Sequence, residues 1–216
     1  MNIENINTEK VRSMEAMFQR CSKLTTLDLS SFDTSNLTNM HCMFHKCGGL
    51  TNLNVSNFNT EKVTTMYNMF NQCGKLTSLD LSSFRTNNVT DMYGMFYLNS
   101  SLTNLNVSNF NTEKVTNMGY MFNNCRTITQ LDLSSFNTSN ITDMNGMFAN
   151  CKALVNLDIS NFNTSKVTDM SSMFLNCLVL TSIDVSKFDT RNVTNMNSMF
   201  FDCDKLTNID VSNFDT

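Results

Sequence analysis

The sequence lacks several features on which common classes of function depend. It has no tryptophan, no proline, two histidines and only six glycines in 216 residues. Its formal charge of -4 and pI near 5.1 give no basic excess to contact a phosphate backbone, so nucleic-acid binding is not expected. No stretch approaches the roughly 18 apolar residues that span a bilayer, and the first residues have no basic start followed by an apolar run. Neither a membrane-inserted segment nor a signal peptide is therefore predicted.

Methionine and phenylalanine are in excess, with 17 of each. Such a skew indicates that one short pattern has been copied along the chain. An aliphatic residue indeed recurs every 26 residues without insertion or deletion, at Leu24, Leu50, Leu76, Leu102, Ile128, Leu154, Leu180 and Leu206. A strict period of this length is typical of a solenoid, in which each unit buries its apolar face against its neighbours. We therefore predict a single solenoid domain over residues 1–216.

Each unit contains the pattern Leu-x-x-Leu-Asp-Leu, which alternates apolar and polar residues at its end, as a half-buried strand does. In the first copy, Leu27 and Leu29 would face the core and Asp28 the solvent. Stacking of these strands predicts one parallel sheet along the length of the molecule.

The second half of each unit has large apolar residues at helical spacing, such as Met92, Met95 and Phe96. The segment before them, residues 89–92, is either a second short strand or the entry to a helix. We therefore predict an α/β repeat solenoid of about eight 26-residue coils, each with one or two helical turns. The stacked methionine and phenylalanine columns are expected to form the core rather than a cofactor or metal site.

The unit combines Leu-Asp-Leu-Ser-Ser-Phe, a Thr-x-Asn turn, Val-Thr-Asp-Met and Met-Phe-x-x-Cys, and it resembles the BspA-like leucine-rich repeats of bacterial surface proteins and lipoproteins. The Met-Phe pair recurs from Met17-Phe18 to Met199-Phe200, so the resemblance covers essentially the whole chain. It implies a right-handed leucine-rich-repeat solenoid in a longer protein, located at the cell surface or secreted. It also implies adhesion to a protein ligand such as a host-cell or matrix protein.

The chain begins and ends within a repeat. Residues 2–11 align with residues 54–63 in the middle of a unit, and residues 211–216 show no change towards a polar cap. Two interpretations stay open. The sequence is a segment of a longer array, or its apolar coil edges, which terminal repeats normally cover, associate end to end.

The cysteines fall into a column of the repeat, with Asn99 in its one gap and Cys42 outside it: Cys21, Cys47, Cys73, Cys125, Cys151, Cys177 and Cys203. Equivalent positions on adjacent coils lie about 4.8 Å apart, whereas a disulfide needs Cβ atoms about 3.8 Å apart. Buried free thiols are therefore expected. Zinc is not expected, because no Cys-x-x-Cys pair exists and His41 and His45 are the only histidines.

An outward-facing column of the predicted strands reads Asp28, Asn54, Asp80, Asn106, Asp132, Asp158, Asp184 and Asp210. The alternation of Asp with Asn relieves like-charge repulsion only in its first half. Asp132, Asp158, Asp184 and Asp210 are therefore a candidate binding stripe for a cation or a basic partner. The alternative is a solvated strip in which mutual repulsion raises the carboxyl pKa values.

Hydroxyl groups also form columns. The serine column that begins at Ser30 is expected to bond to the backbone of neighbouring coils, and the threonine columns that begin at Thr34 and Thr38 to the backbone of their turns. No histidine and acid accompany these serines, so nucleophilic catalysis is not predicted.

The two residues before each Met-Phe pair differ from unit to unit, so specificity can reside there. All four tyrosines, Tyr67, Tyr93, Tyr97 and Tyr120, lie in or next to this variable band. Because tyrosine is enriched at binding hot spots, we predict a recognition patch. The alternative is that these rings only cover the edge of the predicted helix.

These features favour a nonenzymatic protein-binding or adhesion module. The competing hypothesis is a structural spacer or a solenoid that assembles end to end. An enzyme is not expected, because nearly every polar residue is copied in each unit while catalysis usually needs one asymmetric site. No cofactor or metal is expected either.

Overall fold

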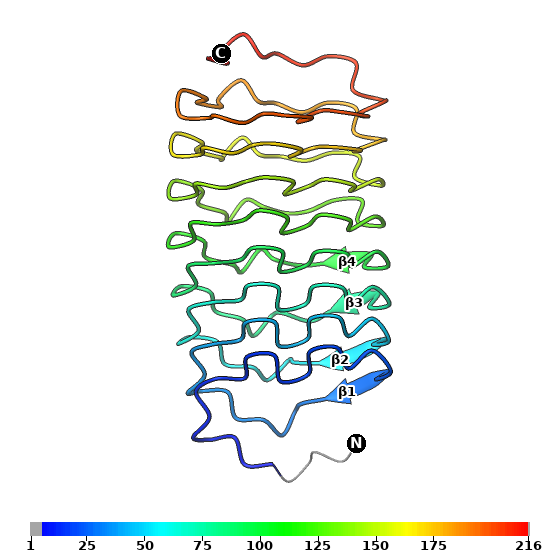
Figure 1. Cartoon of the computed structure of the whole chain (residues 1–216), viewed down its shortest axis with the longest axis vertical. Coiled ribbons are helices and arrows are strands. Elements are labelled where there is room, and N and C mark those ends of the chain that lie inside the picture. Colours follow the sequence, from blue (N-terminus) through cyan, green and yellow to red (C-terminus); the bar gives the residue numbers. More distant parts are fainter. Residues whose placement is uncertain (1–5, 216) are drawn as a thin grey trace.

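The chain folds as a repeat solenoid. The computed structural model describes residues 6–215. Successive coils follow the same path and stack along one long axis, so that early residues (blue) and late residues (red) lie at opposite ends (Figure 1). The predicted repeat solenoid with parallel strands is confirmed.

Short strands form where the Leu-x-x-Leu-Asp-Leu pattern recurs. Strand β1 (Thr26–Asp28) pairs in parallel with β2 (Asn52–Asn54), and β3 (Ser78–Leu79) pairs in parallel with β4 (Asn104–Leu105). Each strand buries its leucine and exposes the residue before it, as the alternation predicts. The side chains that point outwards from this column of segments form the strand face.

The prediction of one continuous sheet is wrong. In the described residues the strands form two separate pairs, and the equivalent segments after Leu105 follow the same path without regular strands. The pairs occupy the half of the chain where Asp and Asn alternate, and the Asn54 amide donates a hydrogen bond to the Asp28 carboxylate at 3.0 Å. From Asp132 onwards aspartates occupy this column without interruption, and the described residues there form no regular strand.

The predicted helical turns are also wrong, because residues 6–215 contain no helix. Around Met92 the main-chain N–H groups alternate between two kinds of partner. Those of residues 92, 94, 96 and 98 donate to carbonyls of the next coil at 2.8 to 3.1 Å, whereas those of residues 95, 97 and 99 donate to the carbonyl three residues earlier. Gly94 and Leu98 have positive φ angles of 58° and 61°, which a right-handed helix does not contain.

This arrangement, which we call the turn ladder, repeats between Met14 and Phe201. Its outward side chains form the turn face. Spacing of three and four residues suits a train of tight turns as well as a helix, so the predicted apolar face is correct although the backbone is not. Met92, Met95 and Phe96 are all fully buried.

Single-residue parallel bridges flank the turn ladder, at Ser13, Asn39, Thr65, Asp91, Asn117, Asp143, Asp169 and Asn195. The segment 89–92 is therefore strand-like, which decides between the two alternatives for it.

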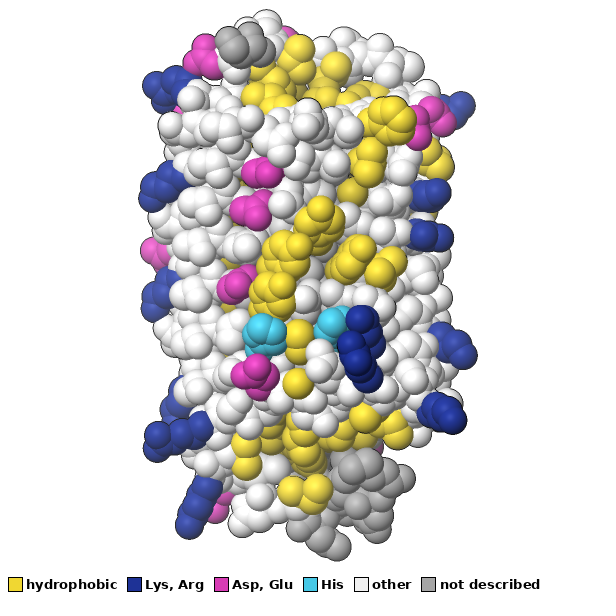
Figure 2. All heavy atoms as spheres, viewed as in Figure 1, with side chains coloured by type: hydrophobic (Ala, Val, Ile, Leu, Met, Phe, Trp, Pro, Cys, Tyr) yellow, Lys and Arg dark blue, Asp and Glu magenta, His cyan; other side chains and the backbone are white. Residues whose placement is uncertain are grey.

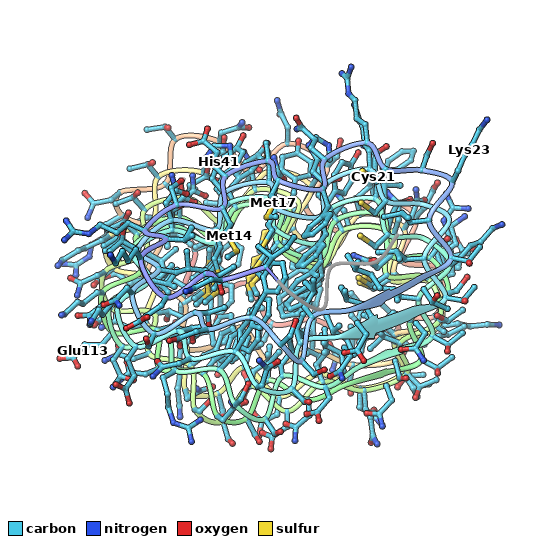
Figure 3. All side chains as sticks on the ribbon, turned by 90° about the horizontal axis from the view of Figure 1, so that it is seen from below. Met14, Met17, Cys21, Lys23, His41 and Glu113 are labelled. Atoms are coloured by element: carbon cyan, nitrogen blue, oxygen red, sulfur yellow. The ribbon has the colours of Figure 1, made fainter. Side chains whose placement is uncertain are left out.

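The apolar columns make one continuous core. Phenylalanine rings stack from Phe18 to Phe200, with centroids 5.5 to 5.9 Å apart. Viewed along the long axis, sulfur atoms lie inside the outline of the coils while Lys23 and Glu113 point outwards (Figure 3). The prediction that the methionine and phenylalanine columns are core is confirmed.

The cysteines are free thiols, and those of the column are buried as predicted except at its two ends, where Cys21 and Cys203 are half-buried. Cys125 is fully buried, and its thiol donates to the carbonyl of Phe96 in the preceding coil at 3.3 Å. Burial raises its pKa to about 12. In the gap of the column, the Asn99 amide donates to the Phe70 carbonyl at 2.9 Å and so takes the place of the thiol.

The threonine hydroxyls bond to neighbouring coils rather than to their own turns, which corrects the prediction. Thr86 Oγ1 donates to the Asn111 carbonyl and accepts from the Asn111 N–H, both at 2.8 Å. Thr90 donates to the carbonyl of Thr64 in the preceding coil at 3.2 Å. Because coils stack at strand spacing, the backbone of the next coil is within reach of a short side chain.

Candidate functional site

Five aromatic side chains form an unbroken strip on the turn face. The rings of His41 and Tyr67 lie 4.7 Å apart, and Tyr67 stacks on Tyr93 at 5.1 Å with 10° between the planes. Tyr120 contacts Tyr93 at 5.5 Å and meets Tyr97 edge to face at 5.8 Å. All five are half-buried. We call these residues the aromatic strip; its yellow part rises above the histidines (cyan) in Figure 2. The structure thus brings the four predicted tyrosines together.

The stacked part of the strip presents ring edges to solvent, because the face of one ring covers the face of the next. Within the described residues, no tyrosine hydroxyl of the strip hydrogen-bonds to another protein group. Burial, with Tyr120 and Tyr67 close by, raises the pKa of Tyr93 to about 12. The hydroxyl of Tyr93 therefore remains protonated at neutral pH and available as a donor.

Glycines on adjacent coils make room for these rings. A Cβ atom at Gly119 would lie 3.1 Å from the ring of Tyr93, and one at Gly146 would lie 3.1 Å from the ring of Tyr120. Gly146 also has a positive φ of 54°, as the turn ladder requires at this position. The sequence shows these glycines in the variable band, but only the stacking of coils shows what they accommodate.

Carboxylates that the sequence pattern did not predict as site residues border the aromatic strip. Asp91 and Asp143 are half-buried, and each Oδ1 accepts the main-chain N–H two residues later, from Tyr93 and Asn145, at 2.9 Å. Burial raises the pKa of both carboxyls, and Asp169 raises that of Asp143 further. Acidic side chains (magenta) lie along one edge of the yellow strip in Figure 2. The residue that forms the bridge changes between Asn, Thr and Asp from unit to unit, and this change was the sequence signal that could have identified these carboxylates.

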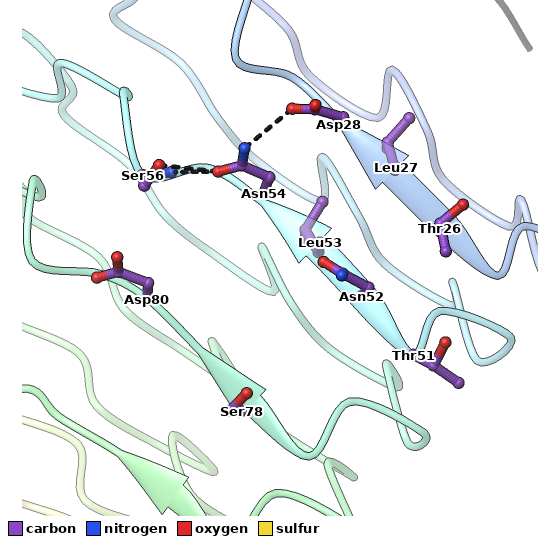
Figure 4. A pocket seen from close by; sticks show the side chains of 10 residues that line it. All are labelled: Thr26, Leu27, Asp28, Thr51, Asn52, Leu53, Asn54, Ser56, Ser78 and Asp80. Carbon is purple, nitrogen blue, oxygen red and sulfur yellow. Dashed lines mark hydrogen bonds between the residues drawn. The ribbon is translucent and has the colours of Figure 1, made fainter.

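The strand face lies across the core from the turn face (Figure 3). A shallow polar depression of about 520 Å³ covers β1, β2 and the start of β3 (Figure 4). There the carboxamide of Asn54 donates to Asp28 at 3.0 Å and accepts from the hydroxyl of Ser56 at 2.8 Å. Hydrogen bonds between side chains therefore fix the positions of these side chains on the strand face.

The predicted acidic stripe, Asp132, Asp158, Asp184 and Asp210, lies fully exposed on the strand face and apart from the tyrosines. Ser134 donates to Asp132 from its hydroxyl at 2.6 Å and from its N–H at 3.0 Å. These bonds lower the pKa of Asp132, and the equivalent serines lower the pKa of the other three.

Two predictions about this stripe are therefore wrong. The carboxyl pKa values are lowered rather than raised, because hydrogen bonds from a serine two residues later outweigh repulsion between charges that water screens. The serine hydroxyls that bond here, such as those of Ser134 and Ser186, contact the aspartate of their own coil rather than the backbone of a neighbour.

Among the described residues, no group of three or more His, Cys, Asp and Glu side chains is arranged to hold a metal ion. The same residues form no helix with the length and apolar character needed to cross a bilayer.

Two solved structures are similar in part. A leucine-rich repeat protein from Bacteroides ovatus is 18% identical with a TM-score of 0.42, over 92% of this chain and 58% of its own. A leucine rich cell surface protein from Faecalibacterium prausnitzii is 15% identical with a TM-score of 0.38, over 93% of this chain and 70% of its own. The chain thus spans less than two thirds of the first protein.

No curated protein matches the chain significantly. A family model does match, over residues 1–79, 75–179 and 125–216, which together cover the sequence from end to end. Its description is "Mycoplasma protein of unknown function, DUF285". The chain therefore belongs to the DUF285 family.

Proposed function

We propose that this chain is a nonenzymatic protein-binding module whose contact surface is the aromatic strip on the turn face. The observation that carries the proposal is the strip itself, in which Tyr67, Tyr93, Tyr97 and Tyr120 gather beside His41 on consecutive coils. Stacked tyrosines offer a large contact area with polar tips, and their mutual packing restricts the rotamers that binding would otherwise have to order.

The construction of the turn face supports the same proposal. Its coils are joined by main-chain hydrogen bonds, so the outward side chains are not needed to hold neighbouring coils together. Residues there can change from unit to unit while the backbone stays the same. A surface of this kind suits the recognition of one particular partner.

Following the resemblance of the repeat, we propose a host-cell or matrix protein as the partner and a location at the cell surface or in the secreted fraction. We also propose the right-handed coil that this resemblance implies. We assign the acidic stripe no part in the contact, because it lies across the core from the strip. Labelling of intact cells with an antibody against the chain, with and without external protease, tests the location.

Binding to immobilised collagen, laminin and fibronectin, measured by surface plasmon resonance, tests the function. For a protein that binds, Tyr93→Ala with Tyr120→Ala should weaken the interaction at least about tenfold, as expected for hot-spot residues. Phe201→Ala is the matched control, because this ring is 58% exposed and lies outside the strip. Tyr93→Phe keeps the packing and isolates the hydroxyl. Binding that the tyrosine variants leave unchanged would refute the strip as the contact surface.

The alternative function is end-to-end association, and the polarity of the turn ladder favours it. Within the described residues, the N–H groups of the turn ladder that bond between coils donate to the next coil, as from Met170 to Asn195, and bonds in the opposite direction, such as Thr194 to Thr168, lie before the ladder. If two molecules stacked end to end in the same orientation, the N–H donors of one ladder would therefore face the carbonyl acceptors of the other. Light scattering during size-exclusion chromatography over a hundredfold concentration range tests this. Mass that grows with concentration supports association, and a constant mass near 24.5 kDa excludes it.

A further inference from the structure

The carboxylates beside the aromatic strip have little cationic compensation from the chain itself. The one ion pair within residues 6–215 joins Arg191 to Asp189, and it involves neither Asp91 nor Asp143. Among charged groups, His41 alone lowers the pKa of Asp91, and for Asp143 the charged neighbours that act are other aspartates. Two partly desolvated negative charges therefore stand next to the rings.

Each of these carboxylates has one oxygen to spare. Oδ1 of Asp91 and of Asp143 holds the turn, and Oδ2 has no hydrogen-bond partner in the part of the chain that the structure describes. Asp169 differs, because its Oδ2 accepts from the Asn195 amide at 3.2 Å. The two unused oxygens are available to a donor from outside the chain.

The surroundings suit an extended cationic side chain. Ring edges of Tyr67 and Tyr93 provide an apolar surface for methylene groups, and a guanidinium or ammonium group can then donate to the nearby carboxylate. Asp91 and Asp143 lie two coils apart along the axis, so one ligand that follows the strip passes both. A compact cation would contact only one of them.

We infer that the aromatic strip takes a basic, extended polypeptide segment, with arginine or lysine side chains placed at Asp91 and Asp143. The inference rests on the proposed function, because it names the chemistry of the partner for the same surface. The positive potential required of the partner complements the carboxylates that border the strip.

Fluorescence anisotropy with three labelled 12-residue peptides tests the charge preference. The peptides alternate glycine with arginine, with glutamine or with glutamate. At low ionic strength the arginine peptide should bind at least about tenfold more tightly than the other two, and added salt should reduce this difference. Equal binding of the three peptides would overturn the inference.

The variant Asp91→Asn with Asp143→Asn locates the effect. The fold should tolerate it, because Asn39 and Asn117 already occupy the same position and hold the same turn through Oδ1. The variant should lose the preference for arginine, with about tenfold weaker binding of that peptide. Asp132→Asn with Asp158→Asn is the matched control, since it removes equal charge from the strand face and should change binding less than about twofold.

The results separate this inference from the proposed function. An arginine preference that survives in Asp91→Asn with Asp143→Asn, or that disappears in the strand-face control, would overturn the inference alone. If the tyrosine variants reduce binding of a matrix protein while the three peptides bind equally, the strip is a protein-binding surface without a basic partner. If the tyrosine variants change neither kind of binding, the proposed function fails as well.

Discussion

The two long faces of the solenoid are built in opposite ways. On the turn face, main-chain hydrogen bonds join coil to coil from Met14 to Phe201. On the strand face, the regular strands found within residues 6–215 pair only as β1 with β2 and β3 with β4, and side chains such as Asp28 and Asn54 bond to one another. The segment with the apolar pattern of a helix therefore carries the more continuous ladder.

This difference explains where the chain varies. Outward positions on the strand face repeat Asp or Asn with a serine two residues later, because these side chains hold the local structure. On the turn face main-chain hydrogen bonds join the coils, and positions such as Tyr93 and Gly119 differ between coils. Substitutions are therefore expected to destabilise the fold least where main-chain hydrogen bonds hold the coils together, and the aromatic strip lies in that region.

The largest expected effect comes from the core that both faces share. Phe122 is fully buried and stacks between Phe96 and Phe148 at 5.8 Å. Phe122→Ala should lower the free energy of unfolding by about 3 to 5 kcal/mol, measured by urea denaturation. The control Phe201→Ala should change it by less than about 0.5 kcal/mol. Similar losses for both would mean that the column does not carry the core.

A smaller effect should separate the turn ladder from ordinary loops. Gly94 has a φ of 58°, and a Cβ atom there would collide with Oδ1 of Asn68. Gly94→Ala should therefore cost about 1 to 3 kcal/mol of unfolding free energy. Gly74→Ala is the control, because its Cβ would meet its nearest neighbour at 3.4 Å. Thermal melts of the two variants should differ clearly, and coincident curves would contradict the strained turn.

The smallest effect is a difference in how the two faces respond to acid. The lowered pKa of Asp132 means that its contribution to stability is present above the ordinary value of 3.8 and is lost as the pH falls through the folded-state pKa. Asp91 and Asp143 have raised pKa values, so the folded state takes up their protons first, and stability rises as the pH falls from the raised values towards 3.8.

Denaturation at a series of pH values, compared between Asp91→Asn with Asp143→Asn and Asp132→Asn with Asp158→Asn, measures this difference. The turn-face variant should lose the gain in stability on mild acidification. The strand-face variant should lose part of the destabilisation at lower pH. Identical pH profiles for the two variants would show that the faces do not differ in this way.

Much of the architecture could be predicted from the sequence, because the repeat is strict. The period gave the solenoid, and the alternation around Leu27 identified the strand position. Columns of Phe, Met and Cys identified the core, because a residue that repeats in every coil stacks on its own copies. The candidate site was predicted in part: the tyrosines were found, whereas Asp91 and Asp143 were not.

The local conformation could not be predicted as well. Met92, Met95 and Phe96 have the same spacing in a helix and in a train of turns, so side-chain periodicity does not distinguish them. A better signal was the recurrence of Gly, Asn, Ser and Asp at the positions of Gly94 and Leu98, since several of these residues tolerate a positive φ.

The sequence by itself therefore determined the period, the identity of the buried columns and the band in which the chain varies, because these depend on which residues repeat. Only the tertiary structure decided which hydrogen bonds each coil makes. An N–H group of the turn ladder can donate either to a carbonyl of its own turn or to a carbonyl of the next coil, and both kinds of bond occur. The tertiary structure also decided the contacts of the variable band. Tyr93 lies against Tyr67 and Tyr120 because neighbouring coils stack within strand distance.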